Sequence, residues 1–266
     1  MSDCDMSKST FICQIENVLY DPTPGNDNVA IAGSVEAVER LQKSSNVYFL
    51  SYSYLKNPSD LADKLNSLGF TVTTERVFTS VTLAKALVMH HSSRAFVSLP
   101  EESRWIFTDA EDLGAPIRNK QSLNFVVIGI PPERMTIQIL NCATNALLTH
   151  PMSYLIVFDN KVIVTVDGEE QRGMGWYGKT ISAMCGRGTI ILNENSSLCF
   201  YALKAHLRLD PDTTCFVGTK EKPALDSLLS VALISNTSKL PESSHLIVEE
   251  SLGSAVNRIF TSLDRV

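Results

Sequence analysis

The strongest indication of the fold is the stretch Thr10-Phe11-Ile12-Cys13-Gln14-Ile15-Glu16-Asn17-Val18-Leu19-Tyr20. It begins with an apolar run, residues 11–15, whose length and composition are those of a buried strand. A short polar loop follows, and the chain then returns to apolar residues. We therefore predict a strand that leads into a polar loop and carries a neutral amide, Gln14, beside a carboxylate, Glu16.

Short apolar runs and helical patterns alternate along the rest of the chain. The runs are rich in β-branched and aromatic side chains, as expected for strands of a sheet that is covered on both faces. Strands that alternate with helices in this way predict an α/β fold with a parallel sheet. The runs are residues 11–15, 47–50, 124–130, 154–158, 215–217, 231–234 and 246–248.

Helix start and stop signals lie between these runs. Ser34 is predicted to cap one helix. Pro58 is predicted to begin a second helix, which ends at Gly69. Pro132 is predicted to begin a third, which runs toward Leu147. Further helical patterns cover residues 198–207 and 252–260.

The composition is that of a globular protein with a sizeable core. Of 266 residues, 44% are apolar and 20% are charged, with a net charge of -6. This acidic balance gives no electrostatic footprint for nucleic acid or an anionic membrane. No segment approaches the roughly 18 apolar residues of a membrane span, and the polar first ten residues carry no secretory h-region. We expect a cytoplasmic protein that binds neither nucleic acid nor membrane.

The cysteines lie far apart and form no Cys-x-x-Cys pair. Several lie inside apolar runs, which predicts buried free thiols in a reducing compartment and no zinc site. Cys13 adjoins Gln14, but side chains alternate along a strand, so Cys13 should point away from whatever Gln14 faces. The six cysteines are Cys4, Cys13, Cys142, Cys185, Cys199 and Cys215.

The opening stretch resembles the first motif of haloacid dehalogenase-like (HAD-like) phosphatases, an apolar strand followed by Asp-x-Asp-Gly-Val-Leu. Later segments resemble, in order, the branch of that family with the phosphoglycolate, pyridoxal-phosphate and p-nitrophenyl phosphatases. They are Ile31-Ala32-Gly33-Ser34, Phe49-Leu50-Ser51-Tyr52-Ser53, Leu68-Gly69-Phe70, Val77-Phe78-Thr79-Ser80, Val126-Val127-Ile128-Gly129, Arg172-Gly173-Met174-Gly175 and Phe216-Val217-Gly218.

The resemblance covers roughly residues 10 to 260 and implies two domains. The first is a HAD-like Rossmannoid core with a parallel sheet, formed by residues 1–80 and 186–266. The second is an inserted α/β cap of the C2 type, residues 81–185. Because caps of this family often mediate dimers, the resemblance also implies a homodimer through the cap.

The resemblance further implies that the catalytic positions have changed. The family's nucleophilic, Mg²⁺-binding Asp corresponds to Gln14, and an amide cannot attack phosphorus as a carboxylate does. The general acid and base corresponds to Glu16, whose extra methylene displaces its carboxyl group. The family's Gly corresponds to Asn17, and its phosphate-gripping Thr corresponds to Ser51, which keeps a hydroxyl.

Two later motifs also lose their charged groups by this comparison. The Lys that neutralises phosphoryl charge corresponds to Glu194, and the first acid of the final motif corresponds to Thr219. Lys222 and Ala224 stand where later acids would be. Asp226 could replace a lost metal acid, but it is two residues from the expected place, so we assign it to the first turns of the last helix. The loss of carboxylates predicts that Mg²⁺ binding is lost or weak.

The interpretation we favour is a catalytically inactive pseudophosphatase that binds a protein or a small phosphorylated metabolite. No residue is expected to act in catalysis, and no metal or other cofactor is expected. Ser51 and Asn17 are the expected residual contacts to a ligand. The vestigial site comprises Gln14, Glu16, Ser51, Glu194 and Thr219.

Two alternatives stay open. The chain could be a weakly active Mg²⁺-dependent phosphatase of small phosphomonoesters such as phosphoglycolate, with Glu16 as the base toward water. It could also be a metabolite sensor that binds through Ser51 and the backbone N–H groups of the loop without turnover. The first predicts hydrolysis that Glu16→Gln abolishes, and the second predicts thermal stabilisation by a ligand.

Two other patterns are interpreted structurally. Residues 173–178 read Gly-x-Gly-x-x-Gly, but a dinucleotide fingerprint needs a preceding strand within a βαβ unit, whereas a polar turn precedes this one. We therefore predict a glycine turn that does not bind nucleotide. His90-His91 closes a helical pattern, where histidine interacts favourably with the helix C-terminus, so a metal site is not predicted there.

Overall fold

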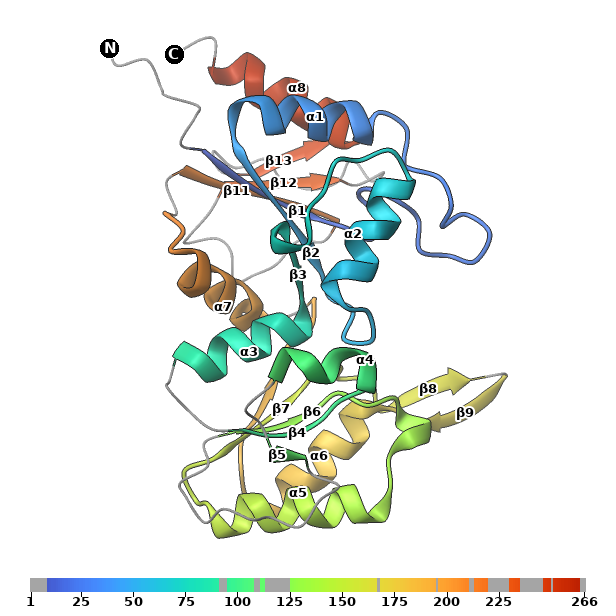
Figure 1. Ribbon diagram of the computed structural model, residues 1–266, viewed down its shortest axis with the longest axis vertical. Coiled ribbons are helices and arrows are strands. Elements are labelled where there is room, and N and C mark those ends of the chain that lie inside the picture. The colour runs from blue at the N-terminus through green and yellow to red at the C-terminus, as the bar shows by residue number, and fades with distance from the viewer. Residues whose placement is uncertain are drawn as a thin grey trace. The chain divides into compact units, whose positions relative to one another are not determined.

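The computed structural model (Figure 1) describes residues 9–90, 95–107, 111–112, 125–166, 168–194, 196–210, 213–219, 230–234, 246–249 and 251–263. The chain divides into two compact units, each with its own sheet. The first unit is Met1–Ser51, Pro58–Phe78 and Arg208–Val266. The second unit is Tyr52–Asn57 and Thr79–Leu207.

A six-stranded sheet with the order β13-β12-β11-β1-β2-β3 organises the first unit. The described pairings of β1 with β2 and β11, and of β12 with β11 and β13, are all parallel. All of the predicted runs at residues 11–15, 47–50, 215–217, 231–234 and 246–248 are strands of this sheet. The strands are β1 (Thr10–Gln14), β2 (Asn46–Ser51), β3 (Val77–Thr79), β11 (Thr214–Gly218), β12 (Ser230–Ile234) and β13 (Leu246–Glu249).

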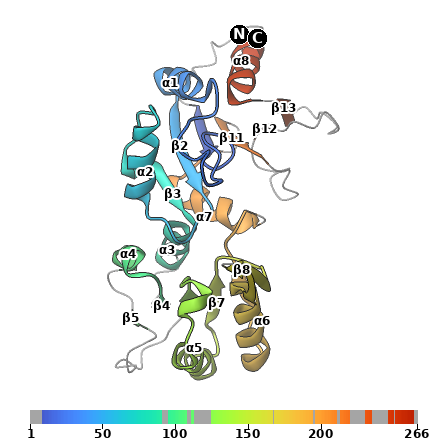
Figure 2. The ribbon, with the colours of Figure 1, turned by 90° about the vertical axis from the view of Figure 1, so that its right-hand side faces the viewer.

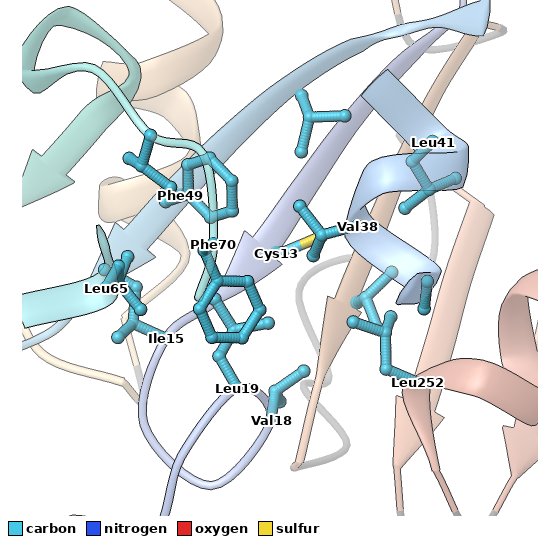
Figure 3. Close-up of a cluster of buried hydrophobic side chains, with 14 of the residues drawn as sticks. Cys13, Ile15, Val18, Leu19, Val38, Leu41, Phe49, Leu65, Phe70 and Leu252 are labelled. Atoms are coloured by element: carbon cyan, nitrogen blue, oxygen red, sulfur yellow. The ribbon is translucent and has the colours of Figure 1, made fainter. Parts of the chain in front are cut away.

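Three helices pack against one face of this sheet. They are α1 (Ser34–Ser44), α2 (Pro58–Ser67) and α8 (Leu252–Leu263), and α1 lies beside α8 (Figure 2). Their apolar stripes meet the strand residues that point the same way, and the resulting core is drawn in Figure 3. Cys13 lies at its centre, with Val38 of α1 and Leu252 of α8 nearby. Cys13 therefore points to the face of β1 that these helices cover.

A five-stranded sheet with the order β10-β7-β6-β4-β5 organises the second unit, and all its pairings are parallel. Helices α5 (Ile137–Thr149) and α6 (Met174–Cys185) pack together and share a core with it. Strands β8 (Ile163–Val166) and β9 (Glu169–Arg172) form a separate antiparallel ribbon (Figure 1). The sheet strands are β4 (Ala95–Ser98), β5 (Glu111–Asp112), β6 (Phe125–Ile128), β7 (Tyr154–Val157) and β10 (Thr189–Ile191).

The remaining elements of the second unit are helical. Helix α3 (Ser80–His90) packs against α7 (Ser197–Leu207), and α4 (Glu101–Arg104) follows β4. The compact units differ from the predicted domains, because residues 52–57, 79–80 and 186–207 group with the second unit. Residues 186–207 do so because β10 pairs with β7 of the second sheet and α7 packs on α3.

Two predicted helix starts are wrong. Ser34 does not cap α1, because Gly33 takes a left-handed conformation with φ 74° and becomes the N-cap, which leaves Ser34 as a buried first helical residue. The Ser34 hydroxyl donates instead to the carbonyl of Leu19, at 3.3 Å. Pro132 begins only a short 3-10 turn, η4 (Pro132–Arg134), and α5 begins at Ile137 after the Thr136 cap. By contrast, α2 begins at Pro58 as predicted.

Within the part of the chain that the structure describes, no helix has both the length and the apolarity needed to cross a bilayer.

Candidate functional site

The candidate site lies where neighbouring parallel strands of the first sheet end. Gln14 is the last residue of β1 and pairs with Leu50 of β2, while Cys13 pairs with Val217 of β11. The next residues along β2 and β11 are therefore brought to the same edge as Gln14. The chain leaves β1 toward β2 and returns from the other side at β11, so this edge is a topological switch point, where α/β sheets bind ligands.

Gln14 joins the ends of β1 and β11 with its side-chain amide. Its Nε2 donates to the carbonyl of Glu16 at 3.1 Å and to Oγ1 of Thr219 at 3.4 Å. Its Oε1 accepts a bond from the backbone N–H of Thr219, also at 3.4 Å. With only 5% of its surface exposed, the amide has both its donor and acceptor sides occupied by protein groups.

Glu16 and Ser51 form a second link at this edge. The Ser51 hydroxyl donates to Oε1 of Glu16 at 2.6 Å, a short bond of the kind expected when the acceptor is ionised. Ser51 is fully buried at the end of β2, whereas Glu16 is half-buried in the loop after β1. The predicted positions 14, 16, 51 and 219 are therefore brought together.

Asn17 forms the turn that follows. Its φ is 64°, a left-handed conformation that glycine adopts freely and asparagine tolerates better than other residues. Its backbone N–H donates to the carbonyl of Tyr20 at 2.8 Å, and its side chain is exposed. Of the loop N–H groups that the sensor alternative assigns to a ligand, the Asn17 N–H is thus already bonded within the loop.

Gly218 also belongs to the site, although a glycine has no functional group from which this could be predicted. A Cβ at this position would lie 2.5 Å from the ring of Phe216 and 2.9 Å from Oε1 of Gln14. The backbone of β11 therefore approaches the Gln14 amide closely because residue 218 has no side chain. Only the Val-Gly pair ending a strand could have indicated this contact from the sequence.

Cys13 points to the opposite face of β1, as the strand alternation predicted. It is fully buried in the core of the first unit, and burial, with a smaller contribution from Cys215, raises the pKa of its thiol far above the ordinary value. A neutral, buried thiol of this kind is not a nucleophile.

Glu194 is placed in the second unit, half-buried in the turn before α7. Gln14, Glu16, Ser51 and Thr219 belong to the first unit. Tyr54 also belongs to the second unit and stacks on Phe158, with ring centroids 5.7 Å apart. Burial, followed by the nearby charges of Asp159 and Glu133, raises the pKa of Tyr54 to about 12.

The Gly-x-Gly-x-x-Gly segment is a packing device. A Cβ on Gly173 would lie 2.3 Å from the carbonyl oxygen of Lys161, and one on Gly175 would lie 2.2 Å from that of Asn160. Among the described residues, the strand before it, β9, pairs with antiparallel β8 alone, so this segment is not part of a βαβ unit there. The prediction of a structural glycine turn agrees with this geometry. Lys222, Ala224, Asp226 and His91 lie outside the described residues.

The oxygen donors at the strand ends are an amide, two hydroxyls and one carboxylate, from Gln14, Ser51, Thr219 and Glu16. Mg²⁺ in proteins has octahedral geometry and is bound through one or two carboxylates together with waters and substrate oxygens. Among the residues that the structure describes, no group of three or more His, Cys, Asp or Glu side chains is placed to hold a metal ion. Among the described residues at this edge, Glu16 supplies the one carboxylate, and its Oε1 already accepts a hydrogen bond from Ser51, so the described donors fit Mg²⁺ poorly.

Comparison with known proteins relates this chain to a family. A family model described as "Haloacid dehalogenase-like hydrolase" matches residues 11–111. Residues 11–111 are therefore HAD-like. The human "Phospholysine phosphohistidine inorganic pyrophosphate phosphatase" is 28% identical over 78% of this chain and 74% of that protein. The mouse "Haloacid dehalogenase-like hydrolase domain-containing protein 2" is 30% identical over 46% of this chain and 44% of its own length, so the match spans less than half of that relative.

Solved structures agree with the fold of this chain. A putative p-nitrophenyl phosphatase from Bacillus subtilis superposes with a TM-score of 0.74 at 17% identity, covering 94% of this chain and 96% of that one. NagD from Escherichia coli superposes with a TM-score of 0.70 at 17% identity, covering 92% and 97%. The two parallel sheets are those of a HAD-like core and a C2-type cap, which confirms the predicted fold class.

Proposed function

We propose that this chain does not transfer phosphoryl groups and acts by binding a protein or a small phosphorylated metabolite. The observation that carries the proposal is that residue 14 is a neutral amide whose polar atoms are hydrogen-bonded to protein groups. The Gln14 amide stands at the end of β1, at the sheet edge where the family places a nucleophilic carboxylate, and it is bonded to Thr219 and to the loop. An amide lacks the negative charge and basicity that a phosphoryl acceptor needs.

The charges around the site support the same proposal. Phosphoryl transfer depends on positioning and on cations that offset the negative charge of the phosphate oxygens. The four described residues at the strand ends contribute one carboxylate and no cation. By the resemblance, Glu194 corresponds in sequence to the family's lysine, so this chain has an anion where the family has a cation.

A second candidate is a weakly active phosphatase, and two observations favour it. Of the two relatives described above, one is named as a hydrolase domain-containing protein and the other as a phosphatase. Glu16 supplies a half-buried carboxylate at the strand ends, positioned by the Ser51 hydroxyl. In this candidate Glu16 would act as a general base toward water rather than as a covalent nucleophile.

The deciding experiment is steady-state hydrolysis by the full chain with Mg²⁺. The substrates are p-nitrophenyl phosphate, phosphoglycolate, pyridoxal phosphate and inorganic pyrophosphate. The variants are Gln14→Ala and Glu16→Gln, with Gln42→Ala as the matched surface control, because Gln42 makes only a surface bond from Nε2 to the Thr71 carbonyl. The expected result is no turnover above that of a heat-inactivated sample for any of them.

Other outcomes assign the function differently. Turnover that vanishes in Glu16→Gln but persists in Gln14→Ala and Gln42→Ala establishes the second candidate. Turnover that vanishes in Gln14→Ala refutes the proposal, because it makes the amide position part of the chemistry. Absence of turnover with a rise in melting temperature on adding phosphoglycolate or pyridoxal phosphate supports metabolite binding. Without any such rise, a protein partner or a second copy of the chain is the occupant to seek.

A further inference from the structure

We infer that the strand ends of this chain are held together by a metal-independent hydrogen-bonded clamp, which consists of Gln14, Gly218 and Thr219. In this clamp the amide of Gln14 joins β1 to β11, at an edge where the described donors fit Mg²⁺ poorly. The inference goes beyond the proposed function and does not depend on it, since it concerns what holds the edge together rather than what the edge binds.

The first support is the pattern of donors and acceptors. Nε2 faces two acceptors, the Glu16 carbonyl at 3.1 Å and Thr219 Oγ1 at 3.4 Å, while Oε1 faces one donor, the Thr219 N–H at 3.4 Å. A carboxylate at this position could accept from the Thr219 N–H and from the rotated Thr219 hydroxyl, but it would face the Glu16 carbonyl with no proton between the two oxygens. The surroundings therefore select an amide over a carboxylate of the same shape.

The second support is the room made for the amide. Gln14 is 5% exposed, so its polar atoms are removed from water and need protein partners. Gly218 lets the backbone of β11 approach until a Cβ there would stand 2.9 Å from Gln14 Oε1. The close approach of the Gly218 backbone to the Gln14 side chain is a matter of packing, separate from the hydrogen bonds of the amide. It therefore supports the clamp independently of those bonds.

The test exchanges the amide for its isosteric acid. Gln14→Glu keeps the side chain's shape and replaces the donor to the Glu16 carbonyl by an acceptor. The new carboxyl group should have a pKa above its ordinary value, because its charged form is desolvated and repelled. Because the pKa is raised in the folded state, the destabilisation is absent below the ordinary pKa of about 4.3. It grows as the pH rises and levels off above the raised pKa.

The matched control is Gln42→Glu, the same exchange at a surface amide that donates to the Thr71 carbonyl. A second variant, Thr219→Val, removes one acceptor while keeping the backbone N–H, and it guards against failure of the first to fold. Thermal melting by circular dichroism is run in EDTA at about pH 7.5 and about pH 5. Hydrogen exchange of the peptides that cover residues 9–20 and 213–219 localises the effect.

For Gln14→Glu we expect a melting temperature lower by about 4–8 °C at the higher pH and a smaller difference at the lower pH. Gln42→Glu should stay within about 1 °C at both, and Thr219→Val should fall between them. The unmodified chain should melt at the same temperature in EDTA and in millimolar Mg²⁺. Equal effects of the two Gln→Glu exchanges, a loss that does not change with pH, or stabilisation of the unmodified chain by Mg²⁺ would overturn the inference.

Discussion

The hydroxyl of Ser51 donates a 2.6 Å hydrogen bond to the carboxylate of Glu16, joining the end of β2 to the loop that follows β1. Ser51 has no exposed surface, and Glu16 is half-buried. A charge-assisted bond in such surroundings is stronger than a surface one. Gln14 and Thr219 are also hydrogen-bonded to each other at this edge of the first sheet. All four side chains therefore already have partners within the protein.

Removing this hydroxyl should destabilise the first unit. Ser51→Ala deletes the donor to Glu16 at a fully buried position, and we expect a loss of about 1–2 kcal/mol. Ser67→Ala is the control, because its hydroxyl donates to the Lys64 carbonyl at the exposed end of α2. Urea unfolding followed by circular dichroism measures both. A Ser51→Ala loss no larger than that of Ser67→Ala would show that the bond contributes little to stability.

A divalent-cation site should appear when carboxylates return to the strand ends. Gln14 and Thr219 have polar atoms 3.4 Å apart, so carboxylates at both positions would be close enough to share one ion. The double variant Gln14→Asp/Thr219→Asp should melt several degrees higher in millimolar Mg²⁺ than in EDTA. Gln42→Asp/Thr71→Asp, on another pair in contact, should show no such difference. If Mg²⁺ does not stabilise Gln14→Asp/Thr219→Asp, positions 14 and 219 do not belong to one site.

The close approach of β11 to Gln14 can be tested at Gly218. Gly218→Ala places a methyl group 2.5 Å from the Phe216 ring and 2.9 Å from Gln14 Oε1, which should cost about 1–3 kcal/mol through displaced neighbours. Gly188→Ala is the control, since a Cβ there has nothing within 4 Å. Chemical denaturation compares the two. If both substitutions change stability equally, the contact is not tight.

Tyr54 should make the second unit sensitive to high pH. Its pKa is raised to about 12, first by burial and then by Asp159 and Glu133, so the folded protein keeps the phenol neutral. The unfolded chain ionises near the ordinary pKa of about 10, so stability falls as pH rises from about 10 to 12. Tyr54→Phe keeps the stacked ring and removes the ionisable group, so the alkaline loss of stability should diminish.

The measurement for this variant uses tryptophan fluorescence. Both tryptophans, Trp105 and Trp176, belong to the second unit and report its unfolding. Tyr201→Phe, at a tyrosine that is 48% exposed, provides the control. We expect it to leave the alkaline transition unchanged. A shift of the same size in Tyr201→Phe would mean that the buried phenol is not responsible.

Local sequence determined much of this protein. The apolar runs predicted seven of the strands, because a buried parallel strand needs continuous apolar residues whatever surrounds it. The alternation along β1 correctly placed Cys13 in the core and away from the Gln14 face. Gly33 and Asn17 both adopt positive φ, but only the structure showed it, so the start of α1 was assigned to the wrong residue.

Tertiary structure decided the rest. The sequence could state that residues 14 and 219 are an amide and a hydroxyl, but only the parallel pairing of β1 with β11 brings residues 205 positions apart into hydrogen-bond range. Pairing of β10 with β7 likewise assigned residues 189–191 to the second sheet, which no local pattern specified. Side-chain identity is a local property of the chain, whereas contacts between distant residues depend on which strands the whole sheet places side by side.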